Sequence, residues 1–153
     1  MDARQQQLIL VAQVAGAMLL GGLIGFEREL AHKPAGFRTH MLVGGATKLF
    51  DGLGITLATP FAGLFPADDF RADPVRVLQA IVLGVSFLSA GTIFRRGGGR
   101  IEGLTTAATI LLAAGVGLAG ALERYVTAVA VTAPALAILR VTKTFETLRR
   151  RKQ

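Results

Sequence analysis

Apolar residues fall into five long runs along the chain, separated by short segments that carry charge, proline or glycine. At 1.5 Å per residue, a helix of about 20 residues crosses the hydrocarbon core of a membrane, which is about 30 Å thick. We therefore predict an all-α fold, a single transmembrane domain that covers the whole chain. Its five helices are expected at residues 8–26, 41–59, 75–94, 103–122 and 125–139, and the basic tail at 140–153 is expected to extend the last one.

The first run has a second interpretation, a cleaved signal peptide with Arg4 ahead of it and a cleavage site at Ala15-Gly16-Ala17. Against this, the apolar run continues without a break to Phe26. Small residues recur four apart in the same run and therefore share one helix face, which lets another helix approach closely. These predicted helix-packing residues are Ala17, Gly21 and Gly25.

Composition supports the membrane class. The chain is 52% hydrophobic with 19 glycines in 153 residues, whereas soluble domains are about 45–50% apolar with glycine included. The mean hydropathy is +0.52. Cysteine and tryptophan are absent and Tyr125 is the only tyrosine, so the net charge of +7 lacks the stacking aromatics of a nucleic-acid surface. We expect membrane lipids as partners and no nucleic acid.

The basic residues predict an orientation. Positive residues concentrate in cytoplasmic loops, and with five spans most of them share one side of the membrane. On that side lie Arg28, Lys33, Arg38, Arg95, Arg96, Arg100, Arg140, Lys143, Arg149, Arg150, Arg151 and Lys152, and on the other lie Arg4, Arg71, Arg76 and Arg124. The amino terminus is therefore predicted outside and the carboxyl terminus inside, where Arg149, Arg150, Arg151 and Lys152 would contact anionic lipid.

Four motifs carry a resemblance to a known family. They are GGLIGFERE at Gly21–Glu29, KPAGFRTHMLV at Lys33–Val43, ADPVRVLQAIVLGVSFLSAG at Ala72–Gly91 and EGLTTAAT at Glu102–Thr109. Together they resemble the MgtC/SapB family of bacterial inner-membrane proteins. The matching polar residues are Glu27, Arg28, Glu29, Arg38, Thr39, His40, Asp73, Arg76, Gln79, Glu102, Thr105 and Thr106.

The resemblance implies a multi-pass protein of the bacterial inner membrane. Family members are associated with magnesium limitation, with the survival of pathogens inside host cells and, in some, with regulation of the ATP synthase. The chain departs from the family at Ser86 and Ser89, where glycines are usual, and at Lys48. It also ends shortly after the fifth run, so we expect the membrane domain without the soluble carboxyl-terminal domain of the virulence members.

Charges within or beside the spans are the candidate functional residues, because a charge in mid-membrane costs roughly 2.5–3.5 kcal/mol unless it is partnered. Lys48 and Asp51 share a helix face, so they form either an internal ion pair or the lining of an ion path. Asp73, with Arg76 and Gln79 on the following turns, is either a helix N-cap or part of a cation or partner site.

A third cluster is expected at the inner surface, where Glu27, Arg28, Glu29, Arg38 and His40 gather. It is either a salt-bridge network that joins the first two helices or a Mg²⁺ site, since Mg²⁺ needs only one or two carboxylates and keeps several waters. Glu27, Glu29, Asp51 and Asp73 are thus the candidate metal ligands, and His40 suits Mg²⁺ poorly.

The other motifs favour structure over chemistry. Thr105 and Thr106 are expected to form hydrogen bonds between or within helices, or to contact a substrate. Gly97–Gly99 is expected to form a turn, and the sequence contains no nucleotide-binding glycine loop and no zinc motif. The sequence therefore predicts a protein that is not an enzyme and has no cofactor beyond Mg²⁺. It would act through helix contacts with a membrane partner or with itself, or alternatively as an oligomeric cation transporter.

Overall fold

Each apolar run forms a helix in the computed structural model, which describes residues 2–62, 73–95 and 101–150 and only the backbone of 3, 55–62 and 142–150. The helices of this part of the chain are α1 (Ala3–Leu30), α2 (Phe37–Ala62), α3 (Pro74–Ala90), α4 (Leu104–Ala121) and α5 (Tyr125–Arg150). The predicted all-α class is confirmed. One short antiparallel pair, β1 (Phe94–Arg95) with β2 (Ile101–Glu102), was not predicted, and the expected turn at Gly97–Gly99 lies outside the described residues.

Local sequence signals explain where several helices begin. The Asp73 carboxylate accepts the backbone N–H of Val75 at 2.9 Å, and Pro74 occupies the first helical position, where its missing N–H costs nothing. Gly103 precedes α4 with φ of +92°, a left-handed conformation in which a Cβ would collide with the carbonyl of Thr92. These signals are local, and the sequence therefore carries them directly.

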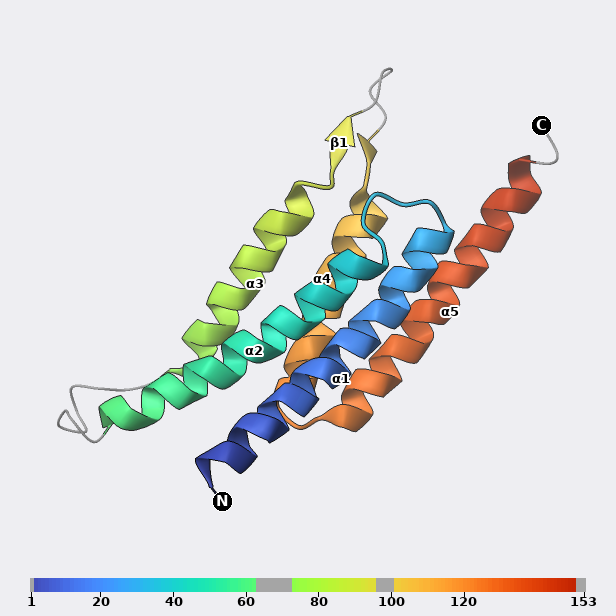
Figure 1. Ribbon diagram of the computed structural model, residues 1–153. Helices are drawn as coiled ribbons and strands as arrows, with labels where there is room; N and C mark the ends of the chain where they lie inside the picture. Colours follow the sequence, from blue (N-terminus) through green and yellow to red (C-terminus); the bar gives the residue numbers. More distant parts are fainter. Residues whose placement is uncertain (1, 63–72, 96–100, 151–153) are drawn as a thin grey trace.

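The helices run up and down, and α4 contacts all four others (Figure 1). One end of the bundle holds the α1–α2 link, the strand pair and the end of α5. The opposite end holds the amino terminus and the turn between α4 and α5 (Figure 1). The three segments that carry most of the basic residues, namely the α1–α2 link, the α3–α4 link and the end of α5, therefore meet at one end. Of the basic residues that were counted, Arg71, Arg96, Arg100, Arg151 and Lys152 lie outside the described residues.

Small residues set the distance between α1 and α2. A Cβ added at Gly25 would lie 2.6 Å from the carbonyl oxygen of Gly36, and one at Gly44 would lie 2.8 Å from that of Ala17. Gly21 likewise faces the α2 backbone directly. The helix face marked by Ala17, Gly21 and Gly25 is thus the face that packs against α2.

Several polar side chains lie inside this bundle, while many large apolar ones lie on its surface. Phe87 and Val126 are each 84% exposed, whereas His40 is fully buried and Lys48 is only 3% exposed. Within the described residues, two helices are long and apolar enough to cross a membrane, Arg4–Leu30 and Leu104–Ala121, and two shorter apolar helices cover Pro74–Ala90 and Tyr125–Val141. A five-span topology stays a prediction.

Candidate functional site

A buried hydrogen-bonded junction joins α2 to α4. His40 Nδ1 donates to the carbonyl of Gly36 at 2.8 Å, and Nε2 lies 3.0 Å from the hydroxyl of Thr109. That hydroxyl also lies 2.9 Å from the carbonyl of Thr106. A carbonyl only accepts, so in the neutral ring Nε2 is an acceptor and the single hydroxyl proton serves either Nε2 or Thr106.

The sequence predicted His40 beside the charged residues at the inner surface. The structure buries its side chain completely and places its backbone against Gly21 of α1, while its depth in a membrane stays a prediction. Thr109 is the polar partner that was missed. Its signal was a third threonine in the apolar α4 run, three residues after Thr106.

The acidic residues of α1 point to different partners. The Arg28 guanidinium donates to the Glu27 carboxylate at 2.7 Å in a pair that is almost completely buried. The other Glu27 oxygen, Oε1, is buried and has no hydrogen-bond partner in the described part of the chain. Glu29 is exposed and accepts the backbone N–H of Phe37 at 2.9 Å, at the start of α2.

The expected five-residue network is therefore divided. Residues two apart on a helix point about 200° apart, so Glu27 and Glu29 do not converge. Arg38 is exposed at the start of α2 and forms no ion pair with the part of the chain that the structure describes. Among the described residues, no group of three or more His, Cys, Asp or Glu side chains could hold a metal ion.

Lys48 and Asp51 do not form the expected ion pair. Instead, Lys48 Nζ donates to the carbonyl of Ala121 at 3.5 Å, at the end of α4. The last carbonyls of a helix lack intrahelical donors and carry negative partial charge, so they attract an ammonium group. Asp51 Oδ2 is left buried with no hydrogen-bond partner among the described residues.

Asp73 is exposed and serves as the N-cap of α3. Arg76 lies 3.6 Å from its carboxylate, and Gln79 is exposed one turn further on. Two cavities, of 590 Å³ between α2 and α3 and 370 Å³ between α4 and α5, include neither Asp51 nor Asp73 in their linings.

The fourth motif lies at β2 and the start of α4. Glu102 is half-buried in β2, opposite Phe94. Thr105 is exposed and lines the 370 Å³ cavity, whereas Thr106 is buried and its carbonyl is the one close to the Thr109 hydroxyl. The helical extension expected for the tail reaches the end of α5 at Arg150.

Comparison with known proteins identifies the family. The model of the MgtC family matches residues 14–148. "Protein MgtC" of Brucella abortus is 44% identical over 107 residues, 70% of this chain and 40% of that protein. "Protein SapB" of Bacillus subtilis is 39% identical over 103 residues, 67% of this chain and 43% of that protein. "Putative magnesium transporter YhiD" of Escherichia coli K12 is 40% identical over 112 residues, 73% of this chain and 47% of that protein.

The chain spans less than half of the length of the curated relatives that it matches. No solved structure matches it. The family model nevertheless covers nearly the whole chain, including all four sequence motifs that carried the resemblance. The chain belongs to the MgtC family.

Proposed function

We propose that this chain is a multi-pass protein of the bacterial inner membrane that takes part in adaptation to low magnesium. It catalyses no reaction and acts through helix contacts with a membrane partner or a second copy. The observation that carries this proposal is the distribution of polarity: many large apolar side chains are exposed, while the Glu27–Arg28 and His40–Thr109 pairs lie inside the bundle.

The membrane setting explains burial that water would not favour. In hydrocarbon, exposed leucine and phenylalanine side chains carry no hydrophobic cost, and polar groups must find partners within the protein. Phe87 and Leu83 of α3 are 84% and 73% exposed, whereas Thr47 and Thr132 are buried and bond to carbonyls of their own helices. The orientation with the amino terminus outside follows from the basic residues at one end of the bundle.

The contacts of the polar residues favour helix docking over transport. An ion path needs several polar groups that face a shared wet space. Here the cavities between the helices are lined almost entirely by apolar side chains and threonines. Glu27 is paired with Arg28, and Asp73 caps its own helix.

A flux measurement tests the non-transport part. Purified protein in liposomes with an enclosed magnesium-sensitive dye is expected to give no flux above that of empty liposomes, with folding checked by circular dichroism. Asp51→Ala and Asp73→Ala are measured beside the wild type. Flux in the wild type that either variant abolishes would refute the proposal and would make the carboxylate concerned a part of the path.

A growth measurement tests the magnesium part. We expect the chain to restore growth at limiting magnesium to a bacterium whose own MgtC-family gene is deleted, and to give no advantage in magnesium-rich medium. Equal growth with and without the chain at limiting magnesium, in cells that contain the folded protein in their membranes, would contradict the proposed role.

A second candidate is an oligomeric carrier of Mg²⁺ or another cation. Asp51 Oδ2, a buried carboxylate oxygen without a hydrogen-bond partner among the described residues, favours it, and so does the name of the Escherichia coli relative. Carboxylate oxygens are the ligands that Mg²⁺ prefers. The same flux measurement decides between the candidates, since only a carrier loses flux on Asp51→Ala.

A further inference from the structure

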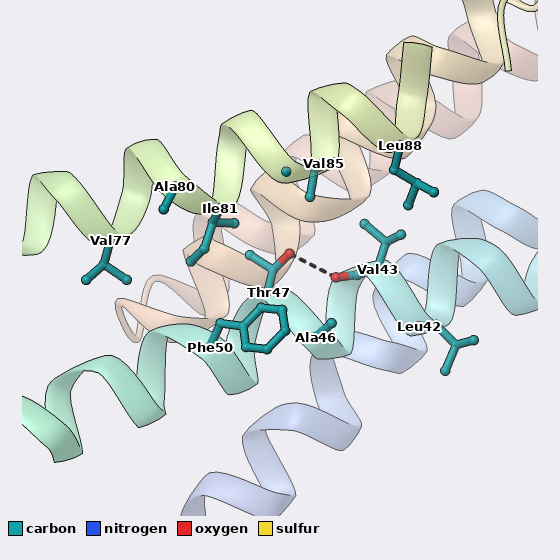
Figure 2. Close-up of a pocket in the computed structure, with 11 residues that line it drawn as sticks. Leu42, Val43, Ala46, Thr47, Phe50, Val77, Ala80, Ile81, Val85 and Leu88 are labelled. Carbon is teal, nitrogen blue, oxygen red and sulfur yellow. Dashed lines mark hydrogen bonds between the residues drawn. The ribbon is translucent and has the colours of Figure 1, made fainter. Parts of the chain in front are cut away.

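The 590 Å³ cavity between α2 and α3 is a long apolar groove (Figure 2). Side chains of both helices line it, among them Leu42, Ala46 and Phe50 of α2 and Ala80, Gly84 and Leu88 of α3. Among the described residues that line it, only Thr47 has a polar side chain, and its hydroxyl is bonded to the Val43 carbonyl at 2.8 Å (Figure 2). This described lining therefore offers hydrocarbon contacts and no free hydrogen-bonding group.

The length of the groove is close to the thickness of one membrane leaflet. Its lining on α3 extends from Val77 to Leu88, which is about 17 Å at 1.5 Å per residue. One leaflet contributes about 15 Å of hydrocarbon, half of the membrane core. The apolar lining of the groove and this length suit an acyl chain that lies in one leaflet.

The two helices approach closely at one end of the groove, and the other end carries positive charge. At the first end Val77 packs against α2, where a Cβ at Gly54 would lie 3.3 Å from it. At the other end Arg38 is exposed one helical turn before Leu42, on the same side of α2. Arg95 is also exposed at this end, in β1.

Two features of α2 make this end suitable for a phosphate. No ion pair joins Arg38 to another described residue, and the nearby carboxylate of Glu29 is occupied by the backbone N–H of Phe37. The half-buried Thr39 stands one helical turn before the lining residue Val43, so it lies on the side of α2 that continues the groove. Arginine is suited to phosphate oxygens through its planar fork of donors.

We propose that the groove holds one acyl chain of an anionic phospholipid whose phosphate binds Arg38 and Thr39. The inference rests on the membrane insertion proposed above but not on the magnesium role. It assigns a lipid-binding site at the α2–α3 groove, distinct from the basic tail at Arg149–Lys152 that the sequence associates with lipid.

Native mass spectrometry of the purified, delipidated protein tests this site. Phosphatidylglycerol and phosphatidylcholine with identical acyl chains are titrated in separate samples. We expect one phosphatidylglycerol per chain at concentrations where phosphatidylcholine binding is weaker. Arg38→Gln should weaken phosphatidylglycerol binding about fivefold, the equivalent of about 1 kcal/mol for one basic residue near an anionic lipid. Arg124→Gln, at the other end of the bundle, is the matched control.

A second pair of variants blocks the groove itself. Gly84 and Gly115 are both exposed helical glycines beside which a Cβ meets nothing within 4 Å, but only Gly84 lines the groove. Gly84→Leu is expected to reduce the binding of both lipids, and Gly115→Leu to leave it unchanged. If circular dichroism shows that Gly84→Leu is unfolded, Ala80→Leu blocks the same space from the same helix.

Three results would overturn the inference. The first is equal binding of the two lipids together with no effect of Arg38→Gln. The second is unchanged lipid binding in folded Gly84→Leu. The third is a dimer that Gly84→Leu abolishes and that added lipid does not change, which would make a second copy the occupant. None of them affects the flux or growth outcomes. A protein recovered in the soluble fraction of cells, by contrast, would refute the membrane setting of both proposals.

Discussion

The close contact between α1 and α2 makes a sharp prediction for Gly25→Ala. An added Cβ would lie 2.6 Å from the carbonyl oxygen of Gly36, 2.8 Å from Cβ of His40 and 2.9 Å from Cα of Phe37. Carbon atoms prefer separations of about 3.5–4.0 Å. Two of the three contacts are backbone atoms, so a change of rotamer cannot relieve them and α2 must move away by about 1 Å.

The expected destabilisation follows from two opposing terms. Overpacking a tightly packed contact costs about 1–3 kcal/mol, and replacing glycine by alanine inside a helix gains about 0.8–1.0 kcal/mol. Gly16 lies on the same helix as Gly25, and a Cβ added there meets nothing within 4 Å. Gly16→Ala therefore isolates the second term. Gly25→Ala should therefore unfold with a free energy about 1–3 kcal/mol below that of Gly16→Ala.

Equilibrium unfolding in mixed detergent, followed by far-ultraviolet circular dichroism, measures this difference. Gly22→Ala provides an intermediate case, since its Cβ meets the side chains of Met41 and Phe37, which can rotate away. The expected order of stability is Gly16→Ala, then Gly22→Ala, then Gly25→Ala. Equal stability of the first and last variants would refute the backbone contact between the two helices.

Two further predictions concern the polar junction and the orientation. Thr109→Val keeps the side-chain shape but removes the hydroxyl beside His40, so the free energy of unfolding should fall by about 0.6–1.7 kcal/mol. Thr132→Val is the control, because it removes a hydroxyl that is bonded within its own helix. An equal loss of unfolding free energy in both variants would contradict the hydrogen bond between α2 and α4. In this cysteine-free chain, a membrane-impermeant maleimide should label Arg124→Cys in intact cells and Lys33→Cys only in inverted vesicles, and the opposite pattern would refute the orientation.

The helices themselves were predictable because the signals for them are local. Apolar runs of nearly membrane-spanning length, separated by proline, glycine and charge, predicted five helices, and five are found among the described residues. The N-cap at Asp73 was equally readable, since a carboxylate directly before Pro74 bonds to the next free backbone N–H. The β1–β2 pair was not predicted, because two-residue strands leave no periodic pattern.

Polar partnerships were harder to predict because they depend on contacts between distant segments. His40 and Thr109 are 69 residues apart in the chain, and Lys48 and Ala121 are 73 apart. Spacing along one helix suggested Asp51 as the partner of Lys48. The carbonyls at the end of α4 receive the ammonium group instead, because the packing of α4 against α2 brings them within reach.

The sequence by itself determined the number and type of the helices, the small-residue face of α1 and the family of the chain. These depend on which residues are neighbours along the chain and on the motifs they form. Only the tertiary structure decided which polar groups meet, that Glu27 and Glu29 diverge, and that α2 and α3 leave a groove between them. Such features arise from the relative positions of packed helices, which the pattern along any one helix does not contain.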